Sequence, residues 1–193
     1  MHNITSIYKN FSESEKSHSM QVVKLASIIF DSTEFLHKLS AREAEYLKCA
    51  AKYHDIGRTI SSTEHYMKSY EIIVNSAIEG FSRSEIELIA QIARYHSGPI
   101  PVKTDKYFKK LDDGQKKIVK KLAGILRVAD ILDREHLELV KNIEFDFQKE
   151  ARILNMKISV LQGGYFPDVK ILAKKKILLE KTFIVQLIVT LAK

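Results

Sequence analysis

The chain of 193 residues contains one cysteine, three prolines, seven glycines and no tryptophan. A single cysteine, Cys49, excludes an internal disulfide and a metal knuckle built on thiolates. No run approaches the ~18 apolar residues that a transmembrane helix needs, and residues 1–11 lack the apolar stretch of a secretory signal. Hydrophobic (45%) and charged (28%) fractions near the globular average exclude disorder and fibrous repeats. We therefore expect a cytoplasmic globular protein.

Acidic residues are scarce at the end of the chain. The net charge is +7, and residues 151–193 hold eight lysines and arginines against two acidic residues. A second basic run extends from Lys103 to Lys121. Such an excess favours anionic partners, namely phosphorylated metabolites, polyphosphate, nucleic acid or an acidic protein. The alternative is a solvated helix face of lysines, and the composition does not separate the two.

The first 140 residues show helical periodicity and helix start signals. Capping boxes, in which a serine is followed three positions later by glutamate, begin at Ser12, Ser40 and Ser82. With the apolar periodicity they predict helices from Ser12 to about His37, from Ser40 to His54-Asp55 with Gly57 as the stop, from about Glu64 to Ala77, from Ser82 to before Gly98, and from about Asp113 to Leu139. Gly124 inside the last helix costs about 1 kcal/mol relative to alanine, which indicates close packing there.

After Val140 the pattern changes to short β-rich segments. Strands are predicted at Asn142–Phe147, Arg152–Leu161 and Phe183–Leu191, with a turn at Gly163-Gly164 and a helix from Asp168 to Lys181. The sequence thus predicts a mainly α protein. Residues 1–140 form a helical bundle, and residues 141–193 form a small β-β-α-β subdomain packed on it.

Histidines and acidic residues recur at the ends and inner faces of successive predicted helices. They are His18 on the first apolar stripe, His54 and Asp55 ending the second helix, His65 starting the third, His96 ending the fourth and Asp130 on the inner stripe of the fifth. Taken singly, a histidine on an apolar face is usually a hydrogen-bonded core residue, and Asp130 can pair with Arg127 or Arg134. Taken together, they favour a metal site, which helical bundles build from inward histidines and carboxylates.

The order His18, His54-Asp55, Asp130 resembles the HD superfamily of metal-dependent phosphohydrolases. The segments YHDIGR (53–58), SYEII (69–73), GFSRSE (80–85), RYH (94–96) and ILRVADILDR (125–134) narrow the resemblance. Together they look like the C-terminal HD-like domain of the exopolyphosphatase/guanosine pentaphosphate phosphohydrolase (Ppx/GppA) family. The resemblance covers most of the chain and implies an all-helical HD bundle followed by a small α/β appendage.

That family usually also has an N-terminal actin-like domain, which holds its phosphatase active site. The HD-like helices here begin near Ser12, so we expect no counterpart of the actin-like domain in this sequence. We therefore expect that exopolyphosphatase activity is not simply inherited. The metal residues are often eroded in the family's HD-like domain but are retained here, which favours a working metal site.

The resemblance implies that His18, His54, Asp55 and Asp130 are metal ligands. Imidazoles with carboxylates suit Mn²⁺, Fe²⁺, Co²⁺ or Ni²⁺ better than Mg²⁺. Such an ion would activate water and polarise a phosphoryl oxygen. His65 and His96 would either hold a second ion or support catalysis as general acids, and we favour one ion per chain.

Arginines near these positions are candidates to neutralise phosphate. Arg58 directly follows the His-Asp segment and is assigned to the catalytic group with His65 and His96. Candidate phosphate ligands are Arg94, Arg127, Arg134 and Lys68. The alternatives are salt bridges from Arg127 and Arg134 to Asp130, and an ordinary surface role for Lys68.

The favoured function is hydrolysis of a phosphate ester or anhydride in a nucleotide or another phosphorylated compound. The alternative is a non-catalytic polyphosphate-binding or dimerisation module, with Lys103–Lys121 and Lys174–Lys176 as the binding track. A nucleic-acid partner fits less well, since only Tyr107-Phe108 places aromatic rings among the basic runs. A purely structural role is the remaining alternative. The apolar strand Phe183–Leu191 could pair across a homodimer.

Overall fold

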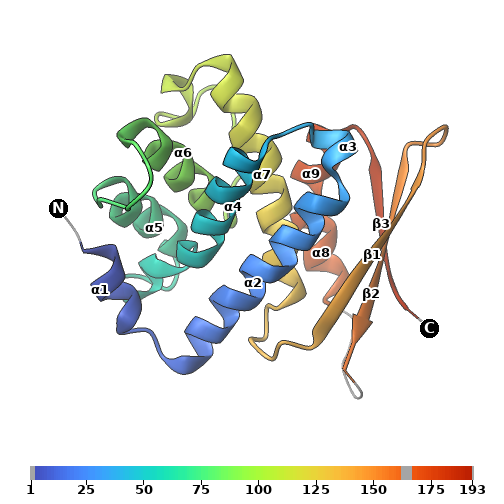
Figure 1. The fold of residues 1–193 in the computed structure, drawn as a ribbon, viewed down its shortest axis with the longest axis horizontal. Coiled ribbons are helices and arrows are strands. Elements are labelled where there is room, and N and C mark those ends of the chain that lie inside the picture. The colour runs from blue at the N-terminus through green and yellow to red at the C-terminus, as the bar shows by residue number, and fades with distance from the viewer. Residues whose placement is uncertain (1–2, 162–166, 193) are drawn as a thin grey trace.

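Helices dominate the computed structural model, which describes residues 3–161 and 167–192 (Figure 1). The helical part comprises α1 (Ile4–Lys9), α2 (Glu13–Ser32), α3 (Glu34–His37), α4 (Ala41–Tyr53), a 3₁₀ turn (Ile56–Thr59), α5 (His65–Val74), α6 (Arg83–Arg94), a second 3₁₀ turn (Phe108–Lys110) and α7 (Asp113–Leu132). The remainder comprises β1 (Val140–Gln148), β2 (Ile153–Val160), α8 (Val169–Lys175), α9 (Ile177–Phe183) and β3 (Gln186–Leu191). The predicted class, mainly α with a small α/β part, is confirmed. The predicted Gly163-Gly164 turn lies outside the described residues.

The predicted helix starts are confirmed at the capping boxes. Ser12, Ser40 and Ser82 are the N-caps of α2, α4 and α6, and in each box the glutamate three positions on accepts from the serine backbone N–H. Asp112 and Gln115 form a fourth box at α7. These local hydrogen bonds satisfy backbone donors that a helix leaves unpaired at its N-terminus.

Several predicted helix ends are wrong. The helix expected to reach His37 is divided at Thr33 into α2 and α3, whereas α4 ends at Tyr53, within one residue of the predicted end at His54-Asp55. The third helix ends at Val74, before the expected Ala77. The fifth ends at Leu132 instead of Leu139, since the Asp133 side chain accepts from the backbone of Glu138 and turns the chain.

The predicted final strand also begins too early. Phe183 is the last residue of α9, and Ile184 adopts a left-handed backbone with φ of 56°. The strand β3 therefore begins at Gln186. The other two strands lie where the sequence predicts them. The single helix predicted at Asp168–Lys181 is divided into two helices, α8 and α9.

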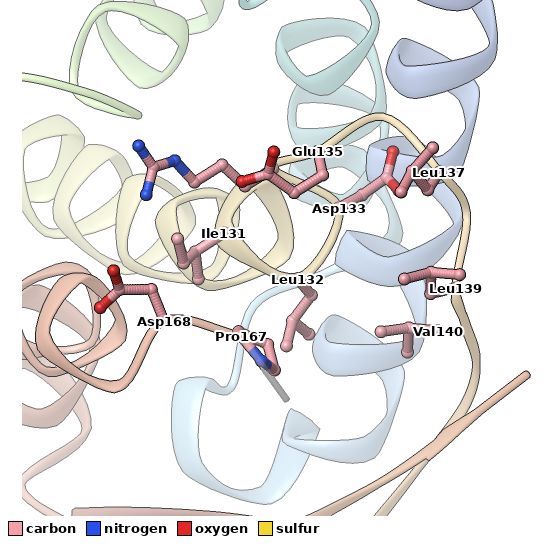
Figure 2. A pocket seen from close by; sticks show the side chains of 10 residues that line it. Ile131, Leu132, Asp133, Glu135, Leu137, Leu139, Val140, Pro167 and Asp168 are labelled. Atoms are coloured by element: carbon pink, nitrogen blue, oxygen red, sulfur yellow. The ribbon is translucent and has the colours of Figure 1, made fainter. Parts of the chain in front are cut away.

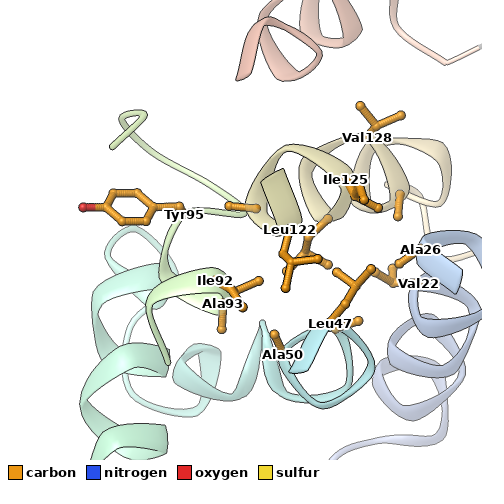
Figure 3. Close-up of a cluster of buried hydrophobic side chains, with 14 of the residues drawn as sticks. Val22, Ala26, Leu47, Ala50, Ile92, Ala93, Tyr95, Leu122, Ile125 and Val128 are labelled. Carbon is orange, nitrogen blue, oxygen red and sulfur yellow. The ribbon is translucent and has the colours of Figure 1, made fainter. Parts of the chain in front are cut away.

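The core of the bundle lies where α2, α4, α6 and α7 meet. Figure 3 shows Val22, Leu47, Ile92, Leu122 and Ile125, which come from these four helices and are fully or almost fully buried. Each helix contributes one apolar stripe, as the period of 3.6 residues requires. Packing of these stripes fixes the relative positions of the helices that carry the histidines.

The sheet has the order β1-β2-β3, with β2 antiparallel to β1 and parallel to β3. The parallel connection contains α8 and α9, which pack against α7 (Figure 1). A Cβ built on Gly124 of α7 would lie 2.9 Å from the backbone of Leu179 in α9. The close packing predicted at Gly124 is therefore confirmed, and it places the C-terminal helices beside the bundle core.

Candidate metal centre

The four predicted metal ligands converge at one end of the bundle. Nε2 of His18, on α2, and Nε2 of His54, which follows α4, each lie 3.7 Å from Oδ1 of Asp130 on α7. Nε2 of His54 also lies 3.7 Å from Oδ2 of Asp55. The donor atoms of His18, His54 and Asp130 lie within 4.8 Å of one another, close enough to share one ion.

His65 and His96 join the same cluster through the other oxygen of Asp55. Their Nε2 atoms lie 3.5 and 3.3 Å from Asp55 Oδ1, and 3.2 Å from each other. His54, Asp55 and His96 form a second group with donor atoms within 4.8 Å. Oδ2 of Asp55 therefore faces His54, and Oδ1 faces His65 and His96.

The backbone sets the protonation of three of these rings. Nδ1 of His54 lies 2.7 Å from the carbonyl of Ala51, and Nδ1 of His96 lies 2.6 Å from that of Ala93. Both are carbonyls of a last helical turn, which lack intrahelical partners. Nδ1 of His65 similarly lies 3.0 Å from the Ser62 carbonyl. Because a carbonyl only accepts, Nδ1 carries the proton and a neutral ring presents the Nε2 lone pair to the cluster.

The resulting set of donor atoms fits a cation. Nε2 of His54 and Oδ1 of Asp55 are buried and form no hydrogen bond with any residue that the structure describes. An unpaired buried acceptor costs about 1–3 kcal/mol, and more if it is charged. Imidazole lone pairs and carboxylate oxygens are all electron-pair donors, and here they face one another. A cation can satisfy all of them at once, so the residues fit a divalent metal.

Gly57 holds the His-Asp turn against α5. A Cβ at this position would lie 2.2 Å from the carbonyl oxygen of His65 and 2.4 Å from the backbone nitrogen of Ser69. The Gly57 N–H donates to the Ser69 hydroxyl at 2.9 Å. Only glycine permits this approach, which brings His65 within reach of Asp55.

Asp133 and His136 belong to the centre although the sequence analysis did not select them. Oδ2 of Asp133 accepts from Nδ1 of His18 at 2.9 Å, and the His136 ring stacks on His18 with 3.8 Å between centroids. Asp133 follows Asp130 by three positions, and this spacing on one helix could have identified it. His136 lies beyond the end of α7, where helical spacing gives no signal.

Opposing effects set the charge states of the centre. Burial disfavours the protonated form of His18, but Asp130 and Asp133 overcome it and raise its pKa to about 9. Burial lowers the pKa of His96 to about 4, which keeps this ring neutral near pH 7. Burial also opposes ionisation of Asp130, but the Lys175 ammonium holds the pKa of that carboxyl well below its usual range.

The predicted phosphate-binding cations lie at different distances from the centre. Arg58 pairs with Oδ2 of Asp55, and 41% of its side chain is exposed. Arg94 forms two bonds to Asp105 at 2.8 and 2.6 Å. Lys68 pairs with Glu71 at 2.9 Å on the surface. Of these three cations, Arg58 is the one that touches the cluster.

Arg127 and Arg134 do not form the salt bridges to Asp130 that were the alternative to phosphate binding. Arg127 donates to the carbonyls of Tyr95 and Gly98 at 2.8 and 3.2 Å. Arg134 is exposed and lines a hollow of about 260 Å³, whose wall includes Asp133 (Figure 2). Within the described residues, the ion-pair partners of Asp130 are His18, His54 and Lys175.

Comparison with protein families identifies one match. The family described as Ppx/GppA phosphatase, domain III, matches residues 2–179. No curated protein matches the chain. Among the described residues, no helix combines the length and apolar character required to cross a membrane.

Proposed function

The chain belongs to the Ppx/GppA phosphatase family, as its domain III, and from this premise we propose that its histidine–aspartate centre is a metal-dependent phosphohydrolase site. The substrate class is a phosphate ester or anhydride, in a nucleotide or another phosphorylated compound. We also propose that the chain belongs to the HD superfamily, because the order of His18, His54-Asp55 and Asp130 resembles the pattern of that superfamily.

One observation carries the proposal: buried imidazoles that present Nε2 to two carboxylates, with Nδ1 already committed to a protein acceptor. His18, His54, Asp55 and Asp130 would hold one ion of Mn²⁺, Fe²⁺, Co²⁺ or Ni²⁺. A purely structural cluster would place a hydrogen-bond donor opposite Nε2 of His54 and Oδ1 of Asp55, and no described residue forms such a hydrogen bond to either atom.

When bound, the ion would lower the pKa of a water molecule and polarise a phosphoryl oxygen. The protein supplies the other parts of the mechanism. Asp133 orients His18, and the backbone carbonyls of α4 and α6 orient His54 and His96. The guanidinium of Arg58 lies beside Asp55 and is partly exposed, so it can meet an incoming phosphate.

His65 and His96 have a separate role. Both Nδ1 atoms face backbone carbonyls, the two Nε2 atoms lie 3.2 Å apart, and burial lowers the pKa of both rings, so both are neutral before the reaction. The pair would accept the proton that the attacking water releases and pass it to a leaving-group oxygen, as general acid catalysis requires. A second metal ion bound between the two Nε2 atoms would take the place of this proton. The number of metal ions per chain distinguishes a second metal site from a general acid.

A non-catalytic polyanion-binding module is the second candidate. A hollow of about 420 Å³ between α7 and α9 is lined by Lys117, Lys120, Lys121 and Lys181, and none of the described residues in its wall is acidic. Such a surface attracts polyphosphate by electrostatics, and its binding would weaken steeply with salt.

Elemental analysis after dialysis, followed by phosphate release from a panel of nucleotides, phosphoesters and polyphosphate, tests the first candidate. We expect about one transition-metal ion per chain, or two if His65 and His96 bind the second. Asp55→Ala should lose the metal and turnover while keeping its helicity. Asp31→Ala, which removes an exposed carboxylate from the end of α2, is the control. Wild-type protein that binds no metal even after incubation with Mn²⁺ would favour the polyanion-binding module.

A further inference from the structure

Lys175, the last residue of α8, reaches the metal centre from the C-terminal part of the chain. Its Nζ donates to Oδ2 of Asp130 at 2.7 Å and to the main-chain carbonyl of His96 at 2.8 Å. The side chain is 16% exposed, so the ammonium lies at the boundary between the cluster and solvent. The tight packing of α9 on Gly124 holds α8 close enough to α7 for this contact.

Asp55 and Asp130, the two carboxylates proposed as metal ligands, each pair with a lysine or arginine. Arg58 contacts Oδ2 of Asp55, and Lys175 contacts Oδ2 of Asp130. Oδ1 of Asp130 faces His18 and His54, so Lys175 lies on the opposite side of the carboxylate from these proposed ligands. An ammonium has three N–H donors, and the hydrogen bonds within the described residues use two of them.

We propose that Lys175 binds a phosphoryl oxygen of the substrate beside the metal ion. This inference rests on the proposed function and adds a substrate-binding residue from α8. Of the predicted cations, Arg94 pairs with Asp105, and both Nη groups of Arg127 donate to backbone carbonyls. Among the described residues, Lys175 and Arg58 are the lysine and arginine that pair with the proposed carboxylate ligands, and a charged donor next to the ion suits a phosphate dianion.

Calorimetric titrations with Mn²⁺ alone, and with inorganic phosphate on the Mn²⁺-loaded protein, test this role. Lys175→Gln should bind Mn²⁺ at least as tightly as wild type, because it removes a competing cation from Asp130. Its affinity for phosphate should fall about tenfold or more. Lys170→Gln makes the same charge change at an exposed position of the same helix and should leave both affinities unchanged.

The outcomes separate the two proposals. Equal phosphate affinity in wild type and Lys175→Gln, or loss of Mn²⁺ binding in the variant, would overturn the role of Lys175 and leave the metal centre standing. Absence of Mn²⁺ binding in wild type would instead remove the proposed function itself. If Lys175→Gln does not fold, Lys175→Arg retains the charge and should bind phosphate within about threefold of wild type. A folded Lys175→Arg that binds no phosphate contradicts the inference.

Discussion

His37 is buried apart from the metal centre and is held in its neutral form. Its Nε2 lies 2.8 Å from the Phe30 carbonyl, and its Nδ1 accepts from the Leu39 N–H at 2.9 Å. Protonation would put a second proton on the ring and break the bond from Leu39. Burial lowers the pKa of His37, and the Lys121 ammonium lowers it further. The Phe30 carbonyl and the carboxylates of Glu34 and Asp31 only partly offset this lowering. The ring therefore resists protonation in the folded state.

This lowered pKa predicts a loss of stability on acidification. Below about pH 6.5 the unfolded chain takes up a proton that folded His37 does not, so the free energy of unfolding falls as pH falls. The loss from this one group is limited to about 1.4 kcal/mol per pH unit. Urea unfolding with a chelator at pH 7.5 and 5.5 should show a smaller pH effect in His37→Asn than in wild type. Identical pH effects in the two proteins would mean that His37 titrates alike folded and unfolded.

Single residues also show how far sequence reasoning reaches into the metal centre. His18 and Asp130 could be predicted to face inward because each shares an apolar stripe with neighbours on its own helix. Lys175 is 45 positions from Asp130, and only the packing of α8 on α7 brings the two together. Helical periodicity shows which face a residue occupies, but it does not show which element lies opposite.

At the scale of elements, helix starts could be predicted better than helix ends. A capping box is complete within four residues, as at Ser82 and Glu85. The end of α7 depends instead on the turn after Leu132, where Asp133 binds both His18 and the Glu138 backbone. The contact between Asp133 and His18 of α2 therefore helps to determine where α7 ends. Because the two residues are distant in the sequence, no local sequence pattern predicts this contact.

The contact between α7 and α9 gives a prediction at the same scale. Gly124→Ala improves helix propensity by about 1 kcal/mol but drives a methyl group into the Leu179 backbone. Overpacking of this kind costs roughly 1–3 kcal/mol, so we expect net destabilisation in urea unfolding. Gly114→Ala in the same helix meets only the Asp112 side chain, at 3.2 Å, and should be near neutral. Equal stability of the two variants would mean that α9 can move away without cost.

At the scale of the molecule, the metal centre connects segments that are distant in the sequence. Its residues come from α2, from the ends of α4 and α6, from α5 and from α7, and Lys175 adds α8. Unfolding of any one of these segments removes ligands or their supports. A metal that binds only the folded arrangement must therefore stabilise the bundle and the C-terminal helices as one unit.

This coupling predicts a metal-dependent melting temperature. At a free Mn²⁺ concentration 100 times the Kd, one bound ion adds about 2.7 kcal/mol to the free energy of unfolding. For a chain of this size, that corresponds to a rise of roughly 5–10 °C. Asp55→Ala should show no rise, whereas Asp31→Ala should match wild type. Lys175→Gln should still show the rise, because it keeps every proposed ligand. A rise in Asp55→Ala equal to that of wild type would place the stabilising ion elsewhere, because this variant removes the carboxylate that lies between both groups of histidines.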